Sequence, residues 1–158
     1  MRSTFAVLTT VLSMALFALS LVLPAFAYQL DDGRSQDVLG LRAFATGWFP
    51  AISEIGSLVT GGGEAKYLPM LAWVANPLLF LAWLAAIDRR QLAAFGLAVA
   101  SLVFGLVFLF AHTVPTVTGG SWPPHCRIGF VVWVLAIACA AVAGVGVDER
   151  VPRAPLSH

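Results

Sequence analysis

Four long stretches without a single charged residue constrain this chain more than any other feature of its sequence. They cover residues 4–27, 67–87, 92–111 and 128–147 and are rich in Leu, Val, Ala and Phe. An α-helix rises about 1.5 Å per residue, so a stretch of roughly twenty residues matches a hydrocarbon core about 30 Å thick. The pattern predicts four membrane-spanning helices.

Composition excludes a soluble globular domain. Charged residues make up 11% of the 158 residues and hydrophobic residues 59%, and the mean hydropathy is +0.89. A soluble domain carries about 25% charged residues, because its surface has to be hydrated. We therefore expect an all-α fold, a four-transmembrane-helix bundle that forms a single integral membrane domain over residues 1–158.

The segments between the stretches predict two outer loops, 28–66 and 112–127, and a cytoplasmic tail, 148–158. In the first outer loop, apolar residues recur at three- and four-residue steps between Leu41 and Leu58, with polar residues between them. This spacing predicts a short amphipathic helix that lies on the outer membrane surface.

The distribution of arginine predicts the orientation. The segments that face one side are short and contain Arg2, Arg89, Arg90, Arg150 and Arg153, whereas the basic residues of the other side are diluted over longer loops. Because segments dense in Lys and Arg stay in the cytoplasm, we expect both termini there.

Residues 1–27 have a second interpretation. Ala25-Phe26-Ala27 follows the helix breaker Pro24 and has the small-x-small pattern of a signal-peptide cleavage site. The apolar run is longer than the usual signal core of about 7 to 15 residues, which favours a retained first span. The cleaved form stays open as the alternative.

Asn76 and Pro77 are the main polar interruption inside the second stretch. Pro77 cannot donate a backbone hydrogen bond and crowds the carbonyl of the preceding turn, so a kink is expected, while the amide of Asn76 can bond to another helix. We interpret the pair as a structural kink and polar clasp. The functional alternative is that the freed carbonyl and the amide bind an ion or small polar ligand.

Small residues predict where helices pack closely. In the third stretch they form two pairs at four-residue spacing, and in the last stretch they share one face. The predicted packing residues are Gly96, Ala100, Ser101, Gly105, Ala136, Ala140 and Gly144.

Three residues near the outer ends of the last two stretches are weak metal-ligand candidates: His112, His125 and Cys126. Imidazole and thiolate groups bind borderline metals, but this spacing matches no known metal motif. No charged residue lies within a stretch and no HExxH or P-loop pattern occurs, so neither a catalytic residue nor a cofactor is predicted. The net charge of +1 without a basic stripe excludes nucleic-acid binding.

The chain resembles a class of small bacterial four-helix integral membrane proteins. The resemblance is carried by the aromatic-x-Ala-Asn-Pro-Leu sequence from Trp73 to Leu78, by Gly47-Trp48, by Arg89-Arg90 and by the Gly-aromatic-x-x-Trp start at Gly129. It implies a topology and no particular activity. The long Pro- and Gly-rich outer loops depart from the pattern.

The expected function is that of a non-enzymatic interaction protein of the bacterial inner membrane, embedded in the lipid bilayer. It would be an accessory or small subunit of a larger membrane complex, or a self-associating bundle, because small-residue faces suit helix contacts. The first alternative is a small transporter, channel or lipid-binding module that uses the break at Asn76-Pro77. The second is an envelope metal- or haem-binding protein.

Overall fold

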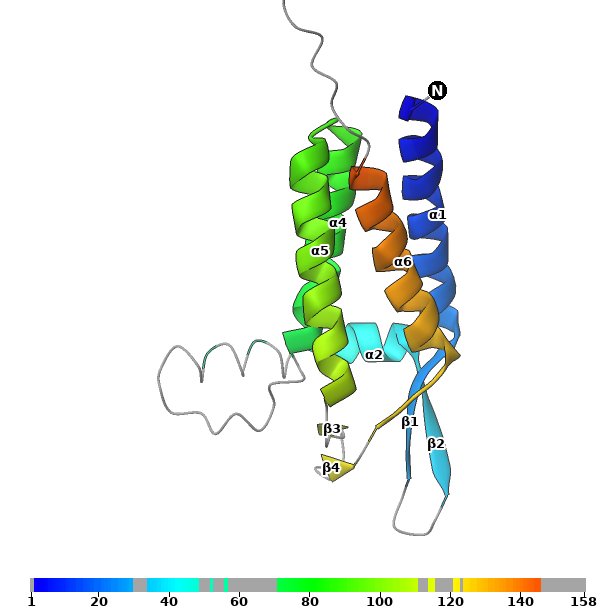
Figure 1. Cartoon of the computed structure of the whole chain (residues 1–158). Coiled ribbons are helices and arrows are strands. Elements are labelled where there is room, and N and C mark those ends of the chain that lie inside the picture. The colour runs from blue at the N-terminus through cyan, green and yellow to red at the C-terminus, as the bar shows by residue number, and fades with distance from the viewer. Residues whose placement is uncertain are drawn as a thin grey trace, which may run out of the picture.

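The computed structural model describes residues 2–29, 34–48, 52, 56, 71–110, 114–115, 121–122 and 124–145. This part of the chain is mostly helical and carries a small three-stranded sheet at one end (Figure 1). In chain order the elements are α1 (Arg2–Val22), β1 (Pro24–Gln29), β2 (Ser35–Leu39), α2 (Gly40–Thr46), α4 (Ala75–Ile87), α5 (Gln91–Val107), η2 (Phe108–Phe110), β3 (Val114–Pro115), β4 (Ser121–Trp122), β5 (His125–Cys126) and α6 (Ile128–Gly144).

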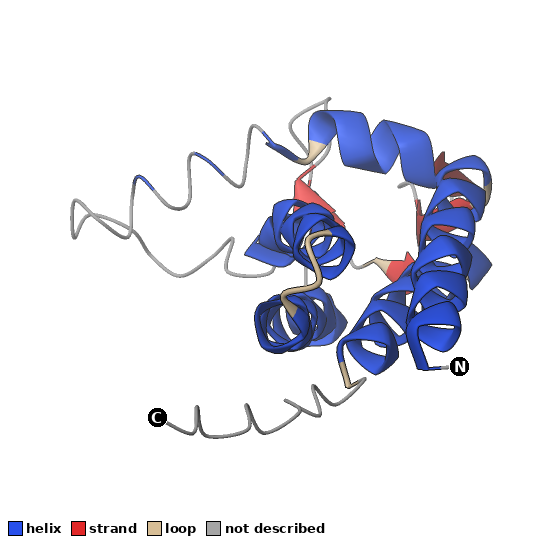
Figure 2. Cartoon of the chain, turned by 90° about the horizontal axis from the view of Figure 1, so that it is seen from above, coloured by secondary structure: helices blue, strands red, loops and turns tan. Residues whose placement is uncertain are grey.

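Four long helices form a bundle in the spatial order α1, α6, α5, α4. α1 packs along α6, α6 along α5 and α5 along α4, whereas α1 and α4 share far fewer contacts. Seen along the bundle, α2 crosses from the side of α4 to the side of α1 (Figure 2). The start of α1 and the turn between α4 and α5 lie at the end opposite the sheet (Figure 1).

The first helix ends at Val22 rather than at residue 27, and the chain continues as strand β1. Pro24 explains this end, because it has no N–H to donate and disfavours helical geometry at the residue before it. Ala27, the last residue of the predicted cleavage pattern, is fully buried in β1.

The sheet corrects the expectation of an all-α fold. Its strand order is β2-β1-β5, and both pairings are antiparallel. β1 pairs Ala27 with Asp37 on one side and with His125 on the other. The start of the last helix is tied to the same strand, because the N–H of Arg127 donates to the carbonyl of Ala25 at 2.9 Å.

The structure describes mainly the first part of the helix predicted for the first outer loop. α2 covers Gly40–Thr46, and the predicted helical pattern beyond Trp48 falls, apart from residues 52 and 56, outside the described residues. The backbone N–H of Gly40 donates to the carbonyl of Leu23 at 2.9 Å, so α2 begins against the end of the first helix.

The described part of the second apolar stretch, Leu71–Ile87, is helical throughout. Residues 71–74 form a 3₁₀ turn, and α4 begins after it, which places Pro77 in the first turn of that helix. The missing N–H of a proline costs least there, since the first N–H groups of a helix have no intrahelical partner. Pro77 therefore lies directly after a change from 3₁₀ to α geometry.

Two of the four predicted spans form helices that are both long enough and apolar enough to cross a membrane. Among the described residues these are Thr4–Val22 and Gln91–Phe110. Leu71–Ile87 and Ile128–Gly144 are apolar but shorter. The fold is thus a mostly helical chain with two candidate spans.

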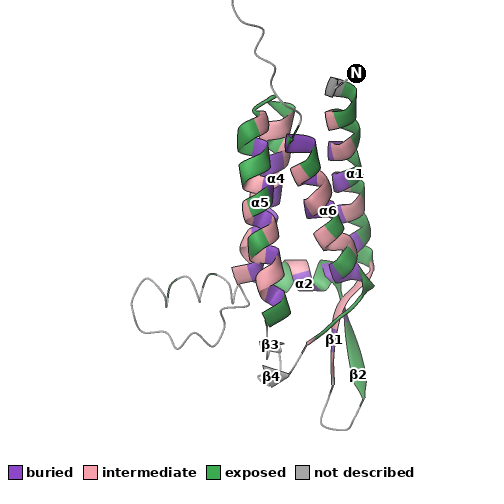
Figure 3. Ribbon diagram, in the orientation of Figure 1, coloured by how far each residue is buried: buried purple, intermediate pink, exposed green. Residues whose placement is uncertain are grey.

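Small side chains fill the centre of the bundle and allow close helix contact. The buried residues face inward along all four helices (Figure 3). At Gly144 a Cβ would lie 2.6 Å from the backbone nitrogen of Phe95, so α6 meets α5 at backbone distance. At Gly96 a Cβ would meet nothing within 4 Å, so this residue takes no part in packing within the chain.

Substitution of these two glycines by alanine should have opposite effects on stability. Gly144→Ala forces two backbones apart and should destabilise the protein by about 1–3 kcal/mol, as overpacking does. Gly96→Ala meets open space and should stabilise α5 by up to about 1 kcal/mol, because alanine has the higher helix propensity. Thermal unfolding of both variants in the same detergent tests this. Equal shifts in the same direction would contradict the close contact at Gly144.

Candidate functional site

Polar side chains inside the bundle are used to join helices. The indole N–H of Trp83 in α4 donates to the Ser13 hydroxyl in α1 at 2.9 Å. The same hydroxyl donates to the carbonyl of Ala136 in α6 at 2.6 Å. Ser13 is fully buried, so this chain of two hydrogen bonds connects three helices without water.

Asn76 makes a similar connection nearer the sheet. Its side-chain oxygen accepts a hydrogen bond from the indole N–H of Trp133 in α6 at 3.0 Å. At the preceding residue, Ala75, the backbone carbonyl accepts a hydrogen bond from the Ser101 hydroxyl of α5 at 2.7 Å. The first turn of α4 is therefore bonded to both α5 and α6, and the predicted clasp residue has an identified partner.

A cavity of about 60 Å³ lies beside Asn76, where the helices meet the sheet. Its walls come from the last turns of α1, the first turns of α4 and α6, the strand β1, α2 and η2. The lining residues are Phe17, Ser20, Leu21, Ala25, Phe26, Gly40, Ala43, Phe44, Ala72, Trp73, Asn76, Phe108, Gly129, Phe130 and Trp133.

Aromatic rings build two sides of this cavity. Phe17 in α1 meets Phe44 of α2 and Phe80 of α4 edge to face, with centroids 5.9 and 5.4 Å apart. On the other side, Phe108 of η2 lies 5.6 Å from Phe26 and 5.5 Å from Phe130. Such pairs contribute about 0.5–1.5 kcal/mol each beyond their buried area, so the walls are stiff.

The short helix α2 covers the cavity because glycines at its two ends allow close contact. A Cβ at Gly40 would collide with the carbonyl of Ser20, and a Cβ at Gly47 would lie within the indole ring of Trp73. α2 is thus seated on the last turn of α1 and on the start of the second apolar helix. Ala43, midway between the two glycines, points into the cavity and is buried.

The predicted packing residues fall into two groups. Gly105 lies where a Cβ would be 3.2 Å from the Trp133 ring, and Ala136 and Ala140 are buried in the core. Ala100 is half-buried, next to the outward-facing Gly96. The fourth stretch and the second pair of the third stretch therefore pack inside the bundle, whereas the first pair lies toward its surface.

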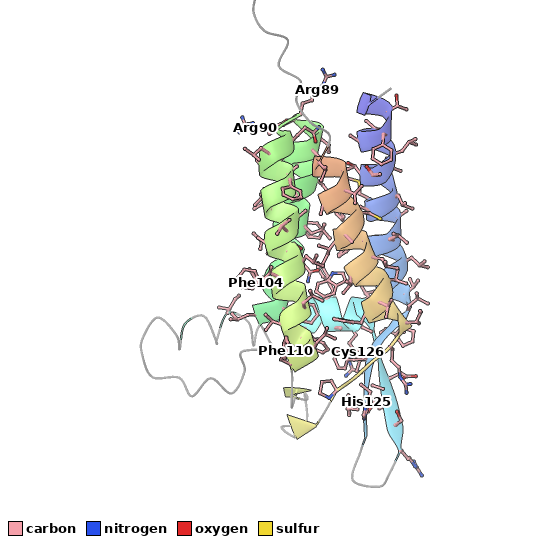
Figure 4. The ribbon with its side chains drawn as sticks, viewed as in Figure 1. Arg89, Arg90, Phe104, Phe110, His125 and Cys126 are labelled. Atoms are coloured by element: carbon pink, nitrogen blue, oxygen red, sulfur yellow. The ribbon has the colours of Figure 1, made fainter. Side chains whose placement is uncertain are left out.

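Two of the three metal-ligand candidates, His125 and Cys126, lie among the described residues. His125 and Cys126 are neighbours on β5, so their side chains point to opposite faces of the sheet (Figure 4). His112 lies outside the described residues. Within the described part of the chain, no group of three His, Cys, Asp or Glu side chains could hold a metal ion.

Partial burial raises the pKa of the Cys126 thiol above its ordinary value, and a backbone hydrogen bond lowers it to a smaller extent. Thiolate is the reactive form of cysteine. Alkylation of Cys126 should therefore be slow at neutral pH and should rise with pH along a curve displaced to higher pH than that of a simple cysteine peptide. The measurement is the iodoacetamide rate against pH in a Cys139→Ser background, and a midpoint at or below that of the peptide would refute it.

The bond between Asn76 and Trp133 can be measured by a double-mutant cycle. Asn76→Leu removes the acceptor and leaves a buried N–H without a partner, so the free energy of unfolding should fall by about 1–2 kcal/mol. Trp133→Phe removes the donor. The double variant should be more stable than the sum of the two losses predicts, and strictly additive losses would show that the bond contributes nothing.

Comparison of the chain with models of protein families, with curated proteins and with solved structures gave no match, so the functional interpretation depends on the geometry described above.

Proposed function

We propose that this chain is a non-enzymatic, four-span membrane protein that acts through lateral contacts, either as a small accessory subunit of a larger membrane complex or as a self-associating bundle. The observation that carries the proposal is the separation of the polar side chains that lie inside the bundle from the large apolar side chains that lie on its outside. Four hydrogen bonds of polar side chains run between helices in the interior of the bundle, and the outward faces are apolar.

The outward faces support embedding of all four helices in lipid. Each helix exposes large apolar side chains, which a water-soluble bundle would cover with charge. The exposed ones are Phe5, Val7, Leu8, Val11, Leu12, Leu19 and Val22 on α1, Leu81, Leu84 and Ile87 on α4, Leu92, Phe95, Val99 and Val103 on α5, and Ile128, Val131, Leu135 and Val142 on α6.

The two shorter helices reach almost as far as the two candidate spans. The 3₁₀ turn at residues 71–74 rises more per residue than an α-helix, so with α4 it extends roughly 28 Å. α6 has 17 residues and extends roughly 26 Å. A bilayer accommodates such a small difference from its core thickness of about 30 Å by slight thinning.

The turn between α4 and α5 supports a cytoplasmic position for that end of the bundle. Arg89 adopts a φ of 58°, and the N–H of Arg90 donates to the carbonyl of Ala85 at 2.8 Å. This is the helix-ending motif in which glycine is the usual residue. An arginine there keeps a positive charge at the end where α1 starts (Figure 4), as the positive-inside rule requires of a cytoplasmic turn.

The outward face of α5 is the best-suited surface for a lateral contact. Ala93 and Gly96 are both exposed and lie on one side of the helix, with half-buried Ala100 one turn beyond Gly96. Small residues let a second helix approach closely, and van der Waals contact drives helix association in lipid. A transport role has less support, because Trp133 already occupies the side-chain oxygen of Asn76.

Purification without crosslinker, followed by mass measurement of the native particle, tests the proposal. The wild-type protein should elute as an oligomer or with a stoichiometric membrane partner. Gly96→Leu adds bulk to the contact face and should reduce the associated fraction several-fold. The control is Ala18→Leu, which adds bulk to an exposed position on α1. A strictly monomeric wild-type protein without a partner would contradict the proposal.

A further inference from the structure

The cavity beside Asn76 is lined mostly by apolar and aromatic side chains, an environment that does not favour bound water. Its two lining residues with hydroxyl or amide side chains already bond within the protein: Ser20 donates to the carbonyl of Phe17 at 2.7 Å, and the Asn76 oxygen accepts from Trp133. A buried water requires two to four polar partners, and cavities without them stay dry. The other lining side chains are apolar or aromatic.

An apolar occupant would restore contacts that an empty cavity lacks. Atoms that line a void lose dispersion contacts on one side. A dry protein cavity of about 150 Å³ accepts a benzene molecule, so on the same scale a volume of about 60 Å³ takes two or three carbon atoms. The space thus fits a short segment of a hydrocarbon chain and is too small for a whole cofactor or drug-sized ligand.

The position of the cavity indicates where such a chain would come from. Phe17, Asn76 and Trp133 each lie five residues from the outer end of an apolar helical segment, which is roughly 8 Å below that end. The cavity is therefore at the depth of the upper acyl chains, if α1 spans the membrane as proposed. Leu21 and Trp73, which line the cavity at this depth, are only half-buried, so the cavity lies close to the surface of the bundle.

We propose that this cavity is a binding site for one acyl chain of an outer-leaflet membrane lipid, which places two or three of its carbons against Phe17, Phe44 and Phe130. The site is distinct from the lateral contact on α5. It rests on the membrane embedding proposed above, but not on any protein partner.

The first experiment measures tryptophan quenching in phosphatidylcholine bilayers that carry bromine in the upper half of one acyl chain. Two of the five tryptophans, Trp73 and Trp133, line the cavity. Ala43→Leu fills the cavity from α2, and its matched control Ala45→Leu adds the same atoms to an exposed position of the same helix. In Ala43→Leu the quenched share of the total tryptophan emission should fall by up to about two fifths, whereas Ala45→Leu should match the wild type.

Equal quenching in the two variants would overturn the proposal. If Ala43→Leu does not fold, Ala72→Leu fills the same cavity from the opposite wall. A second experiment needs no variant: wild-type protein is photolysed in bilayers of a phosphatidylcholine with a diazirine in the upper half of one chain. Crosslinks to Phe44 and Trp133 are expected, and crosslinks confined to the outward faces of the helices would overturn the proposal. Loss of bilayer insertion altogether would instead refute the membrane embedding.

Discussion

Polar groups inside this apolar bundle have to be satisfied by other groups of the protein, and this requirement connects the helices. The Ser13 hydroxyl accepts a hydrogen bond from the indole N–H of Trp83 and donates one to the carbonyl of Ala136, so one hydroxyl joins α4, α1 and α6. Asn76 and Trp133 repeat the arrangement nearer the sheet. Because Ser13 and Asn76 are buried, breaking either bond would leave an unsatisfied polar group in the interior, so these few contacts hold the helices together.

The arrangement of the end of the bundle next to the sheet depends on these hydrogen bonds. Because Asn76 holds the first turn of α4 against α6, Trp73 stands where Gly47 can pack on its ring, and α2 is seated across the bundle. The start of α6 is anchored at Gly129, whose neighbour is the backbone of Pro24 in β1. The cavity is what remains between these rigid, aromatic walls. Shape at this end is thus set by a small number of glycine contacts.

The sequence predicted the helices better than their ends and partners. Uncharged stretches located α1, α4, α5 and α6, because burial in lipid or in a core excludes charge, and the mostly helical class is confirmed. The sheet was missed, since β5 has two residues and pairs with a strand about a hundred positions earlier, a contact without local pattern. The clasp at Asn76 was foreseen, but nothing near it identified Trp133 as its partner. The aromatic cavity was missed for the same reason, although Gly47 beside Trp48 was an available signal.

In the topology that we propose, the four helices cross a membrane with the sheet outside and the α4–α5 turn inside. Cysteine labelling in intact cells with a membrane-impermeant maleimide tests it most directly, in a background of Cys126→Ser and Cys139→Ser. A cysteine at exposed Ser35 of β2 should react without permeabilisation, and a cysteine at Arg89 should react only after it. Reaction of both sites in intact cells, or the reverse pattern, would contradict the account.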